Sequence, residues 1–160
     1  MILYVLRHGE AEPKSSSKRD EERRLSPAGT NQLRKTLSFA KKIGASIDRV
    51  ISSPLVRAKE SSEIAAEVLQ ASEVLVSNSL EPESAPSEVY SELSKWNQDD
   101  RLALVTHQPL VSNLLQDLLG VELNVNMQTG SLARVDVQGY PSSGSGTLVY
   151  LLSGETQLQP

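Results

Sequence analysis

Cysteine is absent from this chain of 160 residues, and histidine occurs only at His8 and His107. Without cysteine, the protein has no disulfide framework, thiolate nucleophile, zinc–thiolate site or iron–sulfur centre. Two histidines are too few for a metal site built from three histidine ligands, and a carboxylate-rich site would need evidence of its own. We therefore predict a protein that works without a metal or another cofactor.

Long apolar segments and aromatic side chains are also scarce. No apolar run approaches the roughly 20 residues needed to cross a bilayer, so we expect no membrane span. The apolar start of the chain has no basic leader region and no cleavage site, which argues against a signal peptide and favours a cytoplasmic location. Aromatic residues make up 4% of the chain, too few for a base-stacking platform, so nucleic-acid binding is only a distant alternative.

The basic charge is concentrated early in the chain. Residues 1–60 contain 13 Lys/Arg and 7 Asp/Glu, a charge of +6, whereas residues 61–160 contain 3 and 13, a charge of -10. This asymmetry favours an anionic ligand near the first part of the chain, although the same residues would also suit exposed helix faces. The length predicts one domain over residues 1–160 with a full hydrophobic core.

Short β-branched runs alternate with amphipathic segments along the chain. Six runs are expected to be strands, at residues 2–6, 49–52, 74–76, 102–106, 132–137 and 147–152. Four segments with helix start and stop residues are expected to be helices, at 26–44, 53–69, 86–97 and 109–120. This alternation predicts an α/β fold, a three-layer α/β/α sandwich around a mainly parallel sheet. The loop at 139–146 is long enough only for a hairpin, which predicts an antiparallel edge.

Residues suited to chemistry follow three of the expected strands. The first strand leads into Arg7-His8-Gly9-Glu10, the second into Ser52-Ser53-Pro54 with Arg57 shortly after, and the fourth ends at Thr106 before His107. In an open α/β sheet, ligands bind outside the carboxyl ends of the strands. We therefore expect both histidines and two arginines to meet at one edge of the sheet.

These side chains would suit a phosphoryl group. A guanidinium grips two phosphate oxygens at once, so Arg7 and Arg57 are expected to hold the group and neutralise its charge. Positive charges on both sides of His8 should keep its imidazole neutral and able to attack phosphorus. His107 is expected to donate a hydrogen bond to a phosphoryl oxygen, and Gly9 to let the backbone approach the phosphate.

Four motifs carry a resemblance to a known family: Leu6-Arg7-His8-Gly9-Glu10, Leu25-Ser26-Pro27-Ala28-Gly29, Ser53-Pro54-Leu55-Val56-Arg57-Ala58 and His107-Gln108-Pro109-Leu110-Val111. Over residues 1 to about 137, the chain resembles the histidine phosphatase superfamily, also called the phosphoglycerate mutase-like fold, and is most similar to the small SixA-type phosphohistidine phosphatases. The resemblance implies that His8 is transiently phosphorylated, that Arg7, Arg57 and His107 form the phosphate pocket, and that water hydrolyses the phosphoenzyme. It also implies a protein substrate that bears phosphohistidine, such as a phosphotransfer domain or a phosphocarrier.

The chain departs from larger members of that family in one respect. Many of them carry an insertion that caps the site and supplies a carboxyl proton donor, but only 49 residues separate Arg57 from His107. We therefore expect no cap and an open, shallow site, which suits a phosphate displayed on a protein. An imidazole leaving group needs little acid assistance, because its pKa lies near 6.5. Glu81 and Glu83 are the candidate proton donors, with Glu10 a weaker third.

Several other interpretations stay open. The runner-up function is a small phosphomonoesterase of broad specificity, and a binding module without turnover would keep the same pocket. Arg57 has a competing role in an ion pair or hydrogen bond with Glu60 or Ser61 on its own helix. Two serines, Ser52 and Ser53, are expected to cap a helix rather than to act as nucleophiles. Trp96 is expected in the core.

The charged run at residues 14–24 is expected to be a solvated loop. Because it follows the His8 motif, we also hypothesise that it touches the protein substrate. Reversing the charges of Arg23 and Arg24 should then slow catalysis on that substrate.

Overall fold

The computed structural model describes residues 1–122 and 126–153. The strands are β1 (Ile2–Arg7), β2 (Arg49–Ser52), β3 (Glu73–Val76), β4 (Arg101–Thr106), β5 (Leu132–Val137) and β6 (Gly146–Leu152). The helices are α1 (Pro27–Lys42), α2 (Val56–Leu69), α3 (Pro86–Leu93) and α4 (Leu110–Leu119), with 3-10 turns η1 (Asp20–Glu22) and η2 (Asn78–Leu80). The expected elements are therefore all present, with ends that shift by a few residues.

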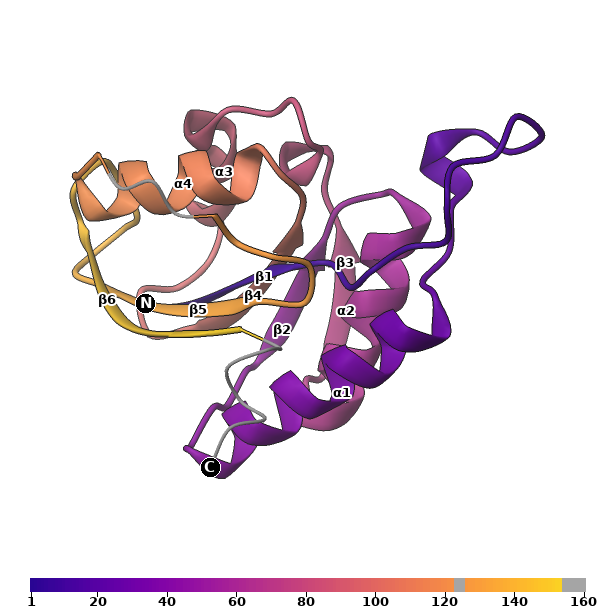
Figure 1. The fold of residues 1–160 in the computed structure, drawn as a ribbon. Coiled ribbons are helices and arrows are strands. Elements are labelled where there is room, and N and C mark those ends of the chain that lie inside the picture. The colour runs from indigo at the N-terminus through magenta and orange to yellow at the C-terminus, as the bar shows by residue number, and fades with distance from the viewer. Residues whose placement is uncertain (123–125, 154–160) are drawn as a thin grey trace.

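One six-stranded sheet runs through the molecule in the order β3-β2-β4-β1-β5-β6 (Figure 1). The strands β1 to β4 pair in parallel, whereas β5 is antiparallel to β1 and β6 is antiparallel to β5. The parallel strands are joined by helices because a parallel crossover needs a long connection, and the last two strands form a hairpin. The mainly parallel sheet with an antiparallel edge is thus confirmed.

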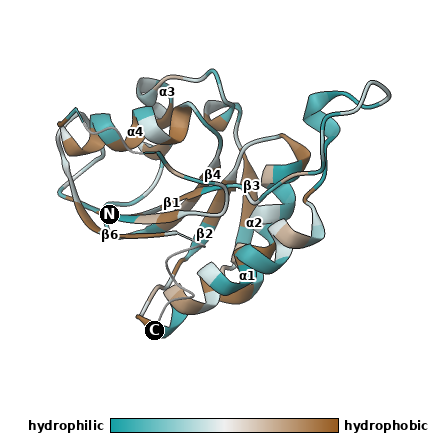
Figure 2. Ribbon diagram, viewed as in Figure 1, coloured by the Kyte–Doolittle hydropathy of each residue, from teal (hydrophilic) through white to brown (hydrophobic). Residues whose placement is uncertain are grey.

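The helices cover the sheet from both sides. Helices α3 and α4 lie on one face and α1 and α2 on the other (Figure 1), each pair over its own cluster of buried apolar side chains. Figure 2 shows apolar residues along the central strands and hydrophilic ones on the loop that projects beyond α1 and α2. The expected three-layer sandwich is confirmed. Within the described residues, none of the helices is long and apolar enough to cross a membrane.

The start of α1 follows the predicted capping pattern. The Ser26 side chain accepts a hydrogen bond from the Gly29 amide at 3.0 Å, and Pro27 occupies the first turn. Leu33 and Leu37 on the buried face are fully inaccessible, and burying each one contributes roughly 2 kcal/mol. Capping and the apolar stripe therefore determine where this helix begins and which side faces the sheet.

The start of α2 differs from the prediction. The helix begins at Val56 after Leu55, and no side chain caps it. Ser53 Oγ accepts a hydrogen bond from the Leu55 amide at 3.3 Å, so this serine stabilises the turn before the helix instead of its first turn. Ser52 donates to the Ser53 carbonyl at 2.9 Å. The capping role expected for the two serines is wrong, because residues 53–55 form a turn of their own.

The weakest predicted helix is shorter than expected. Helix α3 ends at Leu93, and Trp96 lies just beyond it, half-buried against the core cluster under α3 and α4. The Arg49 guanidinium stacks over the indole ring at 5.1 Å from its centre. Trp96 therefore packs on the core as expected, but from the turn after the helix.

Candidate active site

The four side chains expected to do chemistry meet at the carboxyl edge of the parallel strands. Arg7 ends β1 and His8 follows it, Arg57 lies in the first turn of α2, and His107 follows β4. The rings of His8 and His107 are 4.9 Å apart between centres. His8 and Arg57 are each 6% exposed and His107 is 2% exposed, while Arg7 is half-buried. The topology thus gathers the predicted set in one place.

His8 is held with one ring nitrogen committed and the other available. Its Nδ1 lies 2.6 Å from the Gly9 carbonyl oxygen, which can only accept, so Nδ1 carries the proton and Nε2 keeps its lone pair. Burial lowers the pKa of His8 to about 4, the Gly9 hydrogen bond opposes this, and Arg57 and Arg7 lower the pKa further. The ring is therefore neutral at pH 7, as predicted, but burial rather than the arginines is the main cause.

His107 is neutral as well and is oriented by Ser53. The Ser53 hydroxyl lies 2.6 Å from His107 Nε2 and already accepts a hydrogen bond from the Leu55 amide. We assign the Ser53 hydroxyl as the donor to Nε2, and in this tautomer the imidazole proton lies on Nδ1. Burial, followed by His8 and the two arginines, lowers the pKa of His107 to about 2.

Three buried N–H groups at this site have no acceptor among the described residues: Arg7 Nε, Arg57 Nε and His107 Nδ1. A buried donor without a partner costs roughly 1–3 kcal/mol, so each such group requires an explanation. Burial and the nearby Arg57 charge also lower the pKa of Arg7 from its usual range. One anion with several oxygens would satisfy all three donors and offset the repulsion between the two guanidinium groups.

A loop of residues 10–24, called the arm below, makes the site less open than expected. Pairing of Ala11 with Leu25 closes the base of the arm, which projects beside the amino end of α2 (Figure 1). The Arg57 guanidinium donates to the Asp20 carbonyl at 2.9 Å and to its carboxylate at 3.2 Å. Arg23 donates to the same carboxylate at 2.9 Å.

Sequence reasoning placed Asp20 in a solvated loop and missed its contact with the site. The only hint in the sequence was the spacing of Asp20 three positions before Arg23, which is a common surface pattern.

Of the two competing partners of Arg57, Glu60 is wrong, because it instead accepts hydrogen bonds from Arg24 and the Leu25 amide. The Ser61 hydroxyl does bond to Arg57, but it donates to the backbone carbonyl at 2.7 Å and leaves the guanidinium unoccupied by it. Arg57 is thus left for the arm and for a ligand.

Gly9 has a packing role that the sequence did not reveal. Its amide donates to Ser61 Oγ at 3.0 Å, so this amide is already engaged within the protein. A Cβ at Gly9 would lie 2.7 Å from Leu33 Cδ1 and 3.0 Å from the Gly29 carbonyl oxygen. The missing side chain therefore lets β1 approach α1 closely, whereas a phosphate contact was expected.

The three candidate proton donors lie near the same edge. The Thr106 hydroxyl donates to the Leu80 carbonyl at 2.7 Å, which places Glu81 beside the end of β4. Glu83 is exposed, and Glu10 is exposed with its carbonyl bonded to the Ser26 amide at 2.9 Å. Within the described residues, no hydrogen bond or ion pair involves the carboxylate of any of the three. The structure therefore places Glu81 close to the end of β4 and assigns no partner to any of the three carboxylates among the described residues.

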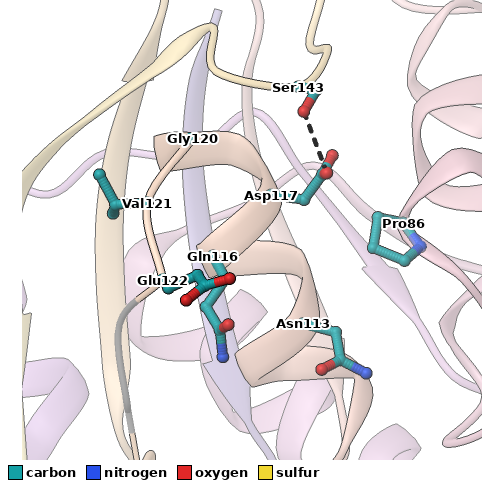
Figure 3. Close-up of a pocket in the computed structure, with 8 residues that line it drawn as sticks. All are labelled: Pro86, Asn113, Gln116, Asp117, Gly120, Val121, Glu122 and Ser143. Atoms are coloured by element: carbon teal, nitrogen blue, oxygen red, sulfur yellow. Dashed lines mark hydrogen bonds between the residues drawn. The ribbon is translucent and has the colours of Figure 1, made fainter.

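A cavity elsewhere in the molecule contains none of the predicted residues. It has a volume of about 420 Å³ and lies at the carboxyl end of α4, between that helix and Ser143 (Figure 3). Both carboxylate oxygens of Asp117 in this cavity accept hydrogen bonds, one from Tyr90 at 2.5 Å and one from Ser143 at 3.0 Å. These bonds tie α3, α4 and the β5–β6 loop together, so Asp117 has a structural role. No cluster of three metal-ligating side chains occurs in residues 1–122 and 126–153.

The two depressed histidine pKa values predict a loss of stability in weak acid. Below pH 6.5 the unfolded chain binds protons that native His8 and His107 do not, so the native state becomes less favourable as pH falls. Between pH 7 and pH 5 each histidine should lower the free energy of unfolding by about 2 kcal/mol. Urea unfolding at both pH values measures the loss. The variant His107→Gln should lose about half as much unfolding free energy between pH 7 and pH 5 as the wild type. An equal loss in the variant and the wild type would contradict the lowered pKa of His107.

Comparison with protein families identifies a match over the first half of the chain. Residues 3–81 match the family described as the histidine phosphatase superfamily (branch 1). This segment contains Arg7, His8 and Arg57. A curated relative, an uncharacterized protein of Picosynechococcus sp., is 29% identical over 111 residues, which cover 68% of this chain and 67% of the relative.

Solved structures share the fold along nearly the whole chain. The protein histidine phosphatase SixA, solved in complex with tungstate, superposes with a TM-score of 0.86 and 26% identity, over 98% of this chain and 99% of that chain. The alpha-ribazole phosphatase of Shigella flexneri superposes with a TM-score of 0.72 and 16% identity, over 96% and 97% of the two chains. The second likeness concerns the fold alone.

Proposed function

Because this chain belongs to the histidine phosphatase superfamily, whose members include phosphoryl-group hydrolases, we propose that it is a phosphohistidine phosphatase acting on a protein substrate. The observation that carries the proposal is the group of three unpartnered donors, Arg7 Nε, Arg57 Nε and His107 Nδ1, around a neutral imidazole. Such a site binds a phosphoryl group and offers it a nucleophile at the same time. A cytoplasmic location remains our prediction.

The reaction proceeds in two displacements at phosphorus. The lone pair of His8 Nε2 attacks, the bond from phosphorus to the substrate imidazole breaks, and that imidazole leaves with the electron pair and is protonated by solvent. Arg7 and Arg57 neutralise the charge on the phosphoryl oxygens, and the neutral His107 donates a hydrogen bond from Nδ1 to one of them. Water then attacks the phosphoenzyme, inorganic phosphate forms, and His8 regains its lone pair. The Gly9 carbonyl holds the imidazole in one orientation through both steps.

The absence of an inserted cap favours a protein substrate. Between Arg57 and His107 the chain contains only the rest of α2, then β3, η2, α3 and β4. These elements are strands and helices of the sandwich and one 3-10 turn, with no inserted subdomain among them. A phosphoryl group on the surface of a protein can therefore reach the edge of the sheet. An imidazole leaving group also needs no strong acid, which agrees with glutamates that have no fixed partner.

A second candidate is a phosphomonoesterase acting on small esters. The observation that favours it is the low exposure of His8 and Arg57, each 6%, with the arm bonded to Arg57. A covered site would enclose a small molecule better than a protein. In that case an alkoxide leaving group would need a proton donor, and Glu81 or Glu83 would have to supply it.

Phosphate release from three substrates separates the two candidates. The purified protein is assayed with a phosphohistidine-bearing protein domain, a sugar phosphate and an aryl phosphate, with His8→Ala as the blank. We expect kcat/KM to be highest for phosphohistidine. Faster release from the sugar phosphate would instead support the phosphomonoesterase, and Glu81→Gln and Glu83→Gln would then be tested for loss of that activity.

Charge reversal on the arm tests whether the arm touches the protein substrate. Arg23 holds Asp20 and Arg24 pairs with Glu60, so reversing either would also disturb contacts inside the protein. Arg19 is better suited, because its side chain is 79% exposed and its ion pair among the described residues is with Glu22 of the same turn. We expect Arg19→Glu to lower kcat/KM about threefold for a phosphoprotein and to leave the aryl phosphate unaffected. Arg34→Glu on α1 is the control. Equal kcat/KM values of the two variants for the phosphoprotein would exclude a contact between the arm and the substrate.

A further inference from the structure

The proposed phosphate site already contains an anion supplied by the protein itself. The Asp20 carboxylate accepts hydrogen bonds from Arg57 Nη2 at 3.2 Å and from Arg23 Nε at 2.9 Å. The Asp20 backbone carbonyl also accepts a hydrogen bond from Arg57 Nη1 at 2.9 Å. Both terminal nitrogens of the Arg57 guanidinium are thus occupied by one residue of the arm, while Nε stays without a partner among the described residues.

The two partners of this ion pair differ in how freely they move. The Arg57 side chain is 7% exposed and belongs to the first turn of a packed helix, whereas the Asp20 side chain is 46% exposed. Asp20 belongs to a 3-10 turn of three residues that buries none of them. When a ligand needs the Arg57 guanidinium, Asp20 is therefore the partner that can leave, since little buried surface is lost when the turn shifts.

A phosphoryl group and the Asp20 carboxylate would share one guanidinium. Asp20 takes one N–H of Nη1 and one of Nη2, so a phosphate that also binds Arg57 is left with Nε–H and the second N–H of each terminal nitrogen. Two anions next to each other on one guanidinium would also repel each other. The carboxylate therefore opposes binding of a phosphoryl group at Arg57, and moving it away favours that binding.

We propose that Asp20 competes with the substrate phosphoryl group for Arg57, so that this aspartate sets the affinity of the site for phosphate. The inference rests on the proposed function, because it takes the Arg7, His8, Arg57 and His107 cluster as the phosphate site. Displacement of Asp20 also frees Arg23, which the carboxylate otherwise pairs. The turn that contains Asp20 then separates from Arg57 when the site is occupied and returns when phosphate leaves, while Arg24 still holds the base of the arm to Glu60 of α2.

The opposite role for Asp20 is that of a positioning residue that holds Arg57 in place for the ligand. The two roles predict opposite changes in phosphate affinity when the Asp20 carboxylate is neutralised. If Asp20 competes, neutralising its carboxylate tightens phosphate binding. If Asp20 positions Arg57, the same change weakens binding, because the guanidinium loses its anchor.

Calorimetric titration of orthophosphate into the wild type, Asp20→Asn and Glu22→Gln provides the test. Glu22 lies in the same turn and loses the same charge, but it pairs with Arg19 and not with Arg57. We expect Asp20→Asn to lower the Kd about three- to tenfold, the range of a partly exposed ion pair, and Glu22→Gln to leave it within a factor of two. An unchanged or higher Kd in Asp20→Asn, with the wild type binding normally, overturns the competition and leaves the proposed function intact.

Two further results separate this proposal from the function on which it rests. If neither the wild type nor Asp20→Asn binds orthophosphate, the phosphate site itself is wrong and both proposals fail. Separation of the turn from Arg57 is followed independently by trypsin cleavage after Arg23, whose side chain is 17% exposed in the closed arm. Saturating orthophosphate should accelerate that cleavage in the wild type, and a rate that phosphate does not change would contradict displacement of Asp20.

Discussion

Replacement of His8 with alanine is expected to abolish phosphate release while phosphate still binds. His8 Nε2 has the only free imidazole lone pair at the site, because Ser53 engages Nε2 of His107 and Nδ1 of that ring carries the proton. Without this nucleophile no phosphoenzyme forms, and kcat should fall by about 10⁴-fold or more. The guanidinium groups of Arg7 and Arg57 remain, so the Kd for orthophosphate should change by less than about fivefold.

The two measurements are single-turnover phosphate release and calorimetric binding of orthophosphate. A trapped phosphoenzyme, stable in base and labile in acid, should form in the wild type and be missing from His8→Ala. His8→Gln serves as a second variant, because its amide fills more of the buried volume than alanine does. Turnover by either variant above one hundredth of the wild-type rate would show that His8 is not the nucleophile.

The fold was largely predictable because its signals are local and repeated. In α1, Ser26 provides the cap and Leu33 and Leu37 the buried stripe, and together they define the helix without help from distant residues. The boundaries were less predictable where a distant contact decides them. Ser53 was expected to cap α2, but its hydroxyl contacts His107, 54 positions away, and the turn around it delays the helix to Val56.

The site was predictable to the extent that strand ends define it. His8 and His107 each follow a strand whose neighbour in the sheet is parallel, so their meeting follows from the topology alone. The arm could not be placed in this way. Its position depends on Asp20 reaching Arg57 across 37 residues, and an Asp–Arg pair of that kind has no periodicity that a single sequence displays.

The cause of the neutral imidazole was also beyond the sequence. Two arginines next to His8 suggested that charge repulsion keeps the ring neutral, but burial is the larger contribution to its lowered pKa. Burial depends on how closely the neighbouring elements pack. Gly9 permits such close packing, because Leu33 Cδ1 of α1 lies only 2.7 Å from the position that a Cβ would take at residue 9. The chemistry of the nucleophile therefore depends on packing that no local motif encodes.

Substitution of Arg57 is expected to have the second largest effect on catalysis. Its guanidinium is buried, carries an unpartnered Nε and stands beside both histidines, so it should bind the transferred phosphoryl group most strongly as charge develops on the oxygens. We expect Arg57→Ala to lower kcat/KM by about 10²- to 10³-fold. Arg57→Lys keeps the charge but not the planar fork, and it should recover only about tenfold of that loss. Steady-state kinetics on the phosphohistidine domain measures both.

The surface variant Arg34→Ala is the matched control, since Arg34 pairs with Glu67 between α1 and α2. It should change kcat/KM by less than twofold, and a loss equal to that of Arg57→Ala would mean that the effect comes from overall charge. The variant Arg57→Ala also tests the competition at the arm. If Asp20 acts through Arg57, then Asp20→Asn tightens phosphate binding in the wild type but not in Arg57→Ala, because the two anions no longer share a guanidinium. Tightening of equal size in both backgrounds would mean that Asp20 repels phosphate directly, without the exchange of partners at Arg57.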